Sequence, residues 1–133
     1  MSGFNVPIRS RSSVLLIHPR LPAGDLLART LNDHGFSTHL VASAAAARVV
    51  ARSSHYRTIV FVTDLWHGSG MADLMTLRGG QPHTWIVVAS PNPAPDEFVD
   101  SLRYLADALL IGPLSTDELV NRLLTFSLRP RPL

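Results

Sequence analysis

The chain alternates short apolar runs with longer stretches in which apolar residues recur at helical spacing. Unbroken apolar runs of four or five residues predict strands that are covered on both faces, as in a parallel sheet. Such runs occupy residues 14–17, 59–62, 85–89 and 108–111. Residues 38–42 alternate polar and apolar side chains instead, which predicts a weaker strand near an edge of the sheet.

A helix is predicted after the first strand. Leu26, Leu27 and Leu31 lie at helical spacing, and Pro22 marks a break in the chain before them. Gly35 stands where a helix C-cap favours glycine, so we expect the helix to end there.

The next two helices are expected to be short and to pack through small or apolar side chains. One spans residues 44–52, with Ser43 as its N-cap and with its alanines and Val49 facing inward. The other begins at Met71 and ends at a pair of glycines. Met71 and Met75 are four residues apart, so we expect them on its buried side.

Two further helices are predicted in the last third of the chain. The first covers residues 96–105 and turns four apolar side chains inward: Phe98, Val99, Leu102 and Leu105. The second begins with the S-x-x-E capping box of Ser115 and Glu118. Five strands that alternate with five helices predict an α/β domain, in which right-handed crossovers build a parallel sheet between two helix layers.

In such a sheet the loops at the carboxyl ends of the strands form the functional crevice. Four of these loops begin at His18, Thr63, Ser90 and Gly112. No repeat or linker divides the chain, which predicts one domain over residues 13–126. We expect residues 1–12 to form a flexible leader, and residues 127–133 to form a tail or the start of a linker.

Composition excludes several classes of protein. Apolar residues make up 46% of the chain and charged residues 17%, a balance that a disordered protein does not have. The apolar runs are too short to span a bilayer, so we expect a cytoplasmic protein. Cysteine and lysine are both absent, which excludes disulfides, thiolate chemistry, lysine Schiff bases and phosphate-loop lysines.

The net charge of +2 does not indicate nucleic-acid binding. Four of the 12 arginines lie in the two end segments, which leaves the predicted domain with more acids than bases. No basic stripe interleaved with aromatic residues occurs, so we do not expect these residues to bind DNA directly.

Three segments together resemble the receiver domain of bacterial response regulators, over residues 13–126. Residues 106–119 (ADALLIGPLSTDEL) are similar to the segment that ends strand five and opens a capped helix five. Residues 56–71 (YRTIVFVTDLWHGSGM) are similar to strand three and its loop, and residues 14–20 (VLLIHPR) with 32–36 (NDHGF) are similar to the first βα unit. The resemblance implies a flavodoxin-like, doubly wound (βα)5 fold with a five-stranded parallel sheet in the order 2-1-3-4-5.

The same resemblance implies that the phosphorylation site is degenerate. A receiver holds Mg²⁺ on an acidic pair, phosphorylates an aspartate, and contacts the phosphoryl group through a hydroxyl and a lysine. An aromatic residue on strand five couples to the hydroxyl. The acidic pair falls on His18 and Pro19, and the acceptor falls on Val62. The hydroxyl falls on Ser90, the aromatic residue on Leu109, and the lysine on Gly112, so Ser90 alone keeps the family's chemistry.

Asp64 is an alternative phospho-acceptor if the loop before Gly70 is two residues shorter than in receivers. We prefer Val62, because this register preserves both the ungapped spacing from His18 and the distance to Gly70. With either residue as acceptor, the metal and lysine partners of phosphoryl transfer are absent.

Other candidate residues each allow a structural and a functional interpretation. Trp66 either covers the top of the sheet or anchors in the vacant pocket or on a partner, and Trp85 is expected in the core. No pair of the six histidines has ligand spacing, so we expect no metal and no other cofactor. A weaker hypothesis places a metal between His18, His67 and Asp64.

Receivers commonly pair through the face that helix four, strand five and helix five form. Here that face carries both charges, on Arg103, Tyr104, Asp107, Asp117, Asn121 and Arg122. Such residues are often only solvated, but these signs also suit a two-fold homodimer, in which an arginine reaches Asp107 or Asp117 of the second copy.

The sequence therefore predicts a pseudo-receiver: a phosphorylation-independent regulatory and protein-interaction domain, not an enzyme, with no membrane contact. We expect it to belong to a transcriptional response regulator, which would contact DNA only through an output module outside this chain. A stand-alone adaptor and a small-molecule sensor that uses the vacated phosphate pocket are the alternatives.

Overall fold

The computed structural model describes residues 13–64, 69–90, 100, 102–113 and 115–127. Its strands are β1 (Ser13–Ile17), β2 (Ser37–Val41), β3 (Thr58–Val62), β4 (Trp85–Ser90) and β5 (Ala108–Ile111). Its helices are α2 (Leu21–Asp33), α3 (Ala44–Ser53), α4 (Gly70–Gly80) and α6 (Thr116–Ser127).

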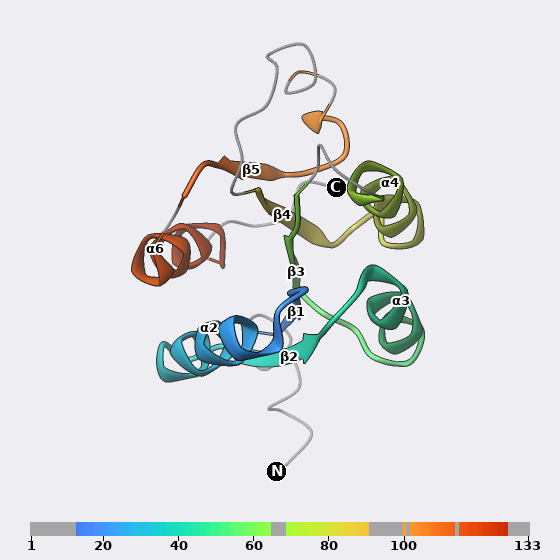
Figure 1. Cartoon of the computed structure of the whole chain (residues 1–133). Helices are drawn as coiled ribbons and strands as arrows, with labels where there is room; N and C mark the ends of the chain where they lie inside the picture. The colour runs from blue at the N-terminus through green and yellow to red at the C-terminus, as the bar shows by residue number, and fades with distance from the viewer. Residues whose placement is uncertain (1–12, 65–68, 91–99, 101, 114, 128–133) are drawn as a thin grey trace.

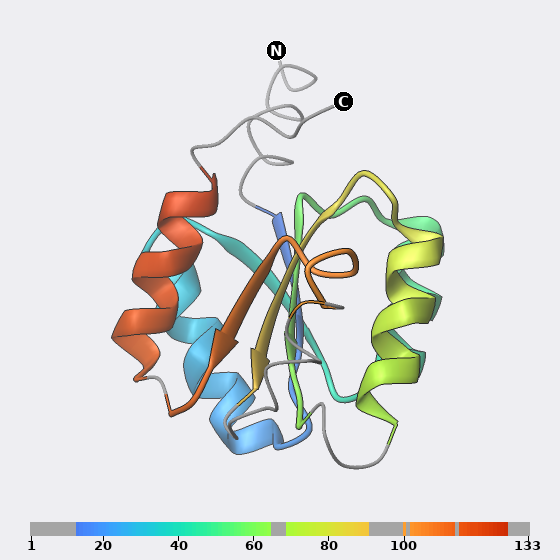
Figure 2. The same cartoon turned by 90° about the horizontal axis from the view of Figure 1, so that it is seen from above.

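The five strands form one parallel sheet in the order β2-β1-β3-β4-β5, as predicted (Figure 1). Helices α2 and α6 cover one face of the sheet, and α3 and α4 cover the other (Figure 2). The weaker strand predicted from the alternating residues is β2, and it lies at an edge. The sheet order reverses between β1 and β3, the place where flavodoxin-like folds carry their ligand sites.

Alternation along the strands divides the core into two layers. Leu15, Ile59 and Ile86 belong to the layer that packs with α3 and α4. Leu16 and Val60 belong to the layer that packs with α2 and α6. Successive side chains of a strand point to opposite faces of the sheet. The layer to which a strand's core residues belong therefore also determines the face toward which its last residue points.

The helix ends follow the predicted capping residues. Ser43 caps α3 by accepting a hydrogen bond from the Ala46 N–H at 3.1 Å. The Ser115 hydroxyl accepts from the Glu118 N–H at 3.1 Å, and the Ser115 N–H donates to the Glu118 carboxylate. Gly35 has a φ of +94°, a conformation that residues with a β-carbon rarely adopt.

Two predictions of helix orientation are wrong, because they assigned Val49 on α3 and Met75 on α4 to the buried side. Both residues are more than half exposed, as is Leu26 on α2. The buried residues instead include Leu27 and Leu31 on α2, Ala44 and Ala47 on α3, and Leu74 and Leu77 on α4. These buried stripes determine which side of each helix faces the sheet. The exposed residues lie at least about 100° away from the stripe around the helix axis.

The prediction that Pro22 breaks the chain before the first helix is also wrong. Pro22 does not separate strand from helix, because it lies within the first turn of α2. A proline costs little there, since the first backbone N–H groups of a helix have no partner inside the helix. Trp85 is buried, as predicted.

Parts of the predicted organisation lie outside the described residues. These are the leader over residues 1–12 and most of the helix predicted over 96–105, of which Leu102 is fully buried and Leu105 partly buried. Helix α6 ends at Ser127, the first residue of the predicted tail. None of the helices in the described ranges is long and apolar enough to cross a membrane.

Arg78 on α4 connects elements that are far apart in the sequence. Its Nη2 donates to the Asp107 carboxylate at 2.7 Å, and its Nε donates to the Leu105 carbonyl at 2.9 Å. Its Nη1 donates to three carbonyl oxygens, those of Gln81, Pro82 and Thr84. The same Asp107 oxygen accepts the Ile86 N–H at 2.8 Å, so one ion pair fixes the end of α4, the start of β4 and the turn before β5.

Candidate functional site

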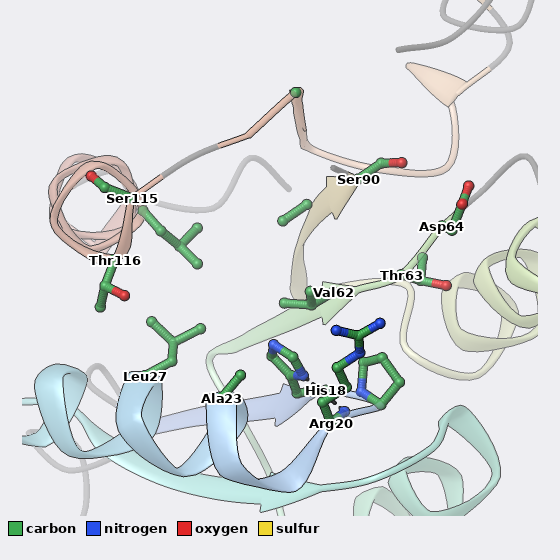
Figure 3. A pocket seen from close by; sticks show the side chains of 14 residues that line it. His18, Arg20, Ala23, Leu27, Val62, Thr63, Asp64, Ser90, Ser115 and Thr116 are labelled. Carbon is green, nitrogen blue, oxygen red and sulfur yellow. Dashed lines mark hydrogen bonds between the residues drawn. The ribbon is translucent and has the colours of Figure 1, made fainter. Parts of the chain in front are cut away.

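A cleft of about 490 Å³ opens at the carboxyl ends of the strands (Figure 3). Its described lining comes from the ends of β3 and β4, from the residues that follow β1, β3 and β5, from the first two turns of α2 and from the start of α6. The lining residues are His18, Pro19, Arg20, Ala23, Leu27, Val62, Thr63, Asp64, Ala89, Ser90, Gly112, Ser115, Thr116 and Leu119.

The cleft brings together five of the six positions that the sequence assigned to a degenerate phosphorylation site. His18 and Pro19 follow β1, Val62 ends β3, and Ser90 ends β4. Gly112 follows β5 with a φ of +98°. Short parallel strands that end at one edge of a sheet bring these distant residues together.

Leu109, the sixth position, does not line the cleft. It is partly buried and packs against the layer of α3 and α4. It also borders a separate hollow beside Arg103. A leucine there lacks the ring through which receivers couple strand five to their phosphorylation site.

His18 is held in one orientation by its neighbours. Its Nδ1 accepts the Arg20 backbone N–H at 3.0 Å, so a neutral ring carries its proton on Nε2. A β-carbon on Gly24 would lie 2.9 Å from the His18 Cβ, so the absence of a side chain there lets α2 approach this residue closely. Burial, and secondly the positive charge of Arg20, lower the pKa of His18 below its ordinary value of 6.5.

The lowered pKa of His18 predicts a pH dependence of stability. The native state binds this proton more weakly than the unfolded state, so stability is complete above pH 6.5 and falls as the pH drops through the lower native pKa. We expect the free energy of unfolding to decrease from about pH 8 to about pH 5 by more in the wild type than in His18→Gln. Urea unfolding of both proteins at each pH measures this difference. The pH dependence of the variant gives the contribution of the other titratable groups, which is subtracted from that of the wild type. Equal pH dependence in the two proteins would contradict the assignment.

Val62 and Asp64 occupy different parts of the cleft. Val62 is the last residue of β3, packs with the α2 and α6 layer, and lies beside His18 in Figure 3. Asp64 comes two residues later, at the rim, and its carboxylate points away from His18 (Figure 3). The residue at the end of β3 is therefore the valine.

Ser90 is the residue that the sequence assigned to the hydroxyl of a receiver site. It is 1% exposed, and its hydroxyl forms no hydrogen bond with the described part of the chain. Buried hydroxyl groups nearly always have a partner, because an unmade hydrogen bond costs free energy. Ser90 is thus a buried polar group beside the cleft that has no partner among the described residues.

The hypothesis of a metal between His18, His67 and Asp64 stays a prediction, because His67 lies outside the described residues. No group of three histidine or acidic side chains in the described ranges is arranged to hold a metal ion. His67, and Trp66 with its two interpretations, lie outside those ranges.

The predicted dimer face is only partly as expected. Arg103, Tyr104, Asp117, Asn121 and Arg122 are exposed, and Tyr104 is exposed by 87%. Asp107 differs, because its side chain is 16% exposed and bound to Arg78. It is an internal ion-pair partner, so it is not available to an arginine of a second copy.

Sequence reasoning missed the residues that line the cleft from the helices. Arg20, Ala23 and Leu27 come from the entrance and first turns of α2, and Thr116 and Leu119 come from α6. Their positions in the sequence could have identified them, because the helix after each of these strands begins beside the strand's carboxyl end.

Comparison with solved structures supports the fold. A receiver domain of a Francisella response regulator is 20% identical, with a TM-score of 0.75 over 87% of this chain and 96% of that one. An orphan response regulator of H. pylori is 22% identical, with a TM-score of 0.75 over 91% and 99% of the two chains. A CheY-like receiver domain from Methanospirillum hungatei is 16% identical, with the same TM-score over 87% and 93%.

No protein-family model and no curated protein sequence matches the chain. The structural likenesses cover nearly the whole of the receiver domains concerned. The chain therefore has the fold of response regulator receiver domains, the CheY-like form of the flavodoxin-like fold.

Proposed function

We propose that this chain is a regulatory receiver-like domain of bacterial signal transduction that acts without phosphoryl transfer. The observation that carries the proposal is the make-up of the cleft. The positions of a receiver's acidic pair and acceptor hold His18, Pro19 and Val62, and the position of its lysine holds Gly112. The sheet and its loops are kept while the reactive groups are replaced.

Physical chemistry explains why this cleft disfavours phosphoryl transfer. Mg²⁺ prefers six oxygen ligands in octahedral geometry, and a transferring phosphoryl group needs cations around its oxygens. Of the described lining residues, Asp64 alone has a carboxylate and Arg20 alone has a permanent positive charge. In Figure 3 the Asp64 carboxylate points away from the His18 side of the cleft.

Incubation with acetyl phosphate and Mg²⁺ tests this proposal. We expect the intact mass of the protein to stay unchanged, because neither acceptor nor metal site is complete. Asp64→Asn is the matched variant. A phosphoryl adduct on the wild type that disappears in Asp64→Asn would overturn the proposal and identify Asp64 as the acceptor.

The proposed output is contact with protein, including a second copy of this chain. The face consists of Arg103 and Tyr104, the edge strand β5, and the exposed side of α6. A hollow of about 370 Å³ lies on it between Arg103 and the side chains of Leu109 and Ile111. Exposed tyrosine and arginine beside half-buried aliphatic residues are typical of interface centres.

The proposal places the domain in the cytoplasm as the regulatory part of a transcription regulator. Contact with DNA then belongs to an output module outside these 133 residues, and a stand-alone adaptor remains the alternative architecture. The domain needs no catalytic residue for this role, so we propose no enzymatic activity.

A further inference from the structure

The cleft at the carboxyl ends of the strands has the dimensions of a small-molecule site. Its volume of about 490 Å³ lies within the range of ligand pockets, which combine mostly apolar walls with a few polar groups. It is located where the strand order reverses, between β1 and β3.

The walls of the cleft are apolar on opposite sides. Ala23 and Leu27 line the cleft from α2, and Leu119 lines it from α6. Figure 3 shows the side chains of Ala23 and Leu27 on α2. The floor is formed by Val62 and Ala89, from the ends of β3 and β4. An aliphatic chain or a single ring fits such a space and removes apolar surface from water.

The α2 end of the cleft favours a negative charge. Arg20 is exposed, makes no ion pair within the described chain, and lines the cleft. In Figure 3 its guanidinium lies beside Val62 and His18. Because the His18 Nδ1 accepts the Arg20 N–H, the neutral ring presents Nε2–H as a second donor.

The other end of the cleft does not favour a negative charge. The first turn of α6 carries Asp117 and Glu118, which already balance the positive end of that helix. Ser115 is engaged with Glu118 in the capping box. An anionic group is therefore expected at Arg20, with the apolar body of its ligand extending toward α6.

Ser90 borders the cleft, but its side chain is turned away from the Arg20 end. It is 1% exposed, and in Figure 3 its hydroxyl points to the side of Asp64 and away from His18 and Arg20. We therefore assign it no contact with the ligand.

We propose that the cleft binds a small organic carboxylate with an apolar body. The carboxylate pairs with Arg20 and accepts from His18, and the apolar body lies between Leu27 and Leu119. A single negative charge fits one guanidinium and a neutral imidazole better than a doubly charged phosphate does. This inference rests on the proposed function, because it requires a cleft that is not used for Mg²⁺ and a phosphoryl group.

The test uses hexanoate and phenylacetate as probes, with hexanamide and phenylacetamide as uncharged controls of the same shape. We expect both carboxylates to raise the thermal midpoint and to shift the amide NMR signals of His18, Thr63 and Gly112, because they bind only the folded state. The two amides are expected to bind about ten-fold more weakly, because they lack the charge-assisted contact.

Two variants assign the contacts. Arg20→Gln is expected to weaken carboxylate binding about ten-fold while leaving amide binding unchanged. Ser90→Ala removes a buried hydroxyl that points away from Arg20, so we expect it to fold normally and to bind carboxylates like the wild type. Arg29→Gln, on the same helix but outside the cleft lining, is the matched control and is expected to bind like the wild type.

Three results would overturn the inference: no shift with either carboxylate, equal binding of carboxylates and amides, or undiminished binding by Arg20→Gln. Titration with Mg²⁺ and beryllofluoride in the same samples separates the two proposals. Binding of beryllofluoride would refute the proposed function, whereas its absence together with absent carboxylate binding would refute this inference alone.

Discussion

Replacement of Arg78 by alanine is expected to lower the free energy of unfolding by about 3 kcal/mol, because it leaves Asp107 partly buried without its counter-charge. Each side chain of this pair is 16% exposed, and the guanidinium also binds four backbone carbonyls. Their loss releases the turn before β4 and the turn before β5 together. Urea unfolding measures the effect as a lower midpoint with an unchanged slope.

Two further variants make the Arg78 measurement specific. Arg48→Ala removes an exposed arginine from α3 and is expected to change stability by no more than about 0.5 kcal/mol. Arg78→Lys keeps the charge but cannot reproduce the planar set of donors, so we expect an intermediate loss. An Arg78→Ala protein as stable as Arg48→Ala would show that the hydrogen bonds around Arg78 contribute nothing.

Charge reversal at Arg122 is expected to weaken self-association about 30-fold. In a two-fold dimer each contact occurs twice, so a loss of about 1 kcal/mol per ion pair counts double. Asp117 is the acid that remains for Arg103 or Arg122 of a second copy, since Asp107 is bound internally. Sedimentation across a wide concentration range measures the dissociation constant of Arg122→Asp against that of the wild type.

A charge swap distinguishes a specific contact from a general change of charge. Combining Arg122→Asp with Asp117→Arg is expected to restore association, because the two charges exchange places across the axis. Arg48→Asp changes the net charge equally on the opposite face of the sheet and is expected to associate normally. Unchanged association of Arg122→Asp would exclude this face as the dimer interface.

Local sequence patterns were sufficient to predict the strands and the α/β class, and the strand order came from the resemblance to receiver domains. The apolar runs identify β1, β3, β4 and β5, and the alternating residues identify the edge strand β2. Ser43 and the pair of Ser115 and Glu118 mark helix starts, because their side chains bond backbone groups only three residues away. Such interactions depend on neighbours in the chain and are therefore visible in the sequence.

Interactions over long sequence distances could not be predicted in the same way. The sequence suggested that Asp107 faces a second copy, whereas it binds Arg78, 29 residues earlier. Nothing in the spacing of these two residues indicates that the turn after Leu105 meets the end of α4. The exposure of Val49 and Met75 was missed for a related reason, because the tertiary packing of a helix decides which of its apolar stripes is buried.

The candidate site was predictable in its positions but not in its local chemistry. The carboxyl ends of the strands identify His18, Val62, Ser90 and Gly112 as neighbours before any coordinates are known. The fixed tautomer of His18 depends on a hydrogen bond to the Arg20 backbone. That the Ser90 hydroxyl has no partner in the described ranges depends on every group around it, so this could not be predicted from the sequence.

The central claim is that the domain works without phosphoryl transfer, and light scattering with and without Mg²⁺ and beryllofluoride tests it most directly. The molar mass of the wild-type protein is measured across a wide range of protein concentrations under both conditions, so that the range includes the concentration at which half of the protein is associated. We predict one curve of mass against concentration under both conditions, because the cleft offers neither an acceptor beside His18 nor a cluster of metal ligands in the described residues. Association that appears only with beryllofluoride would contradict the account and return Asp64 to the role of phospho-acceptor.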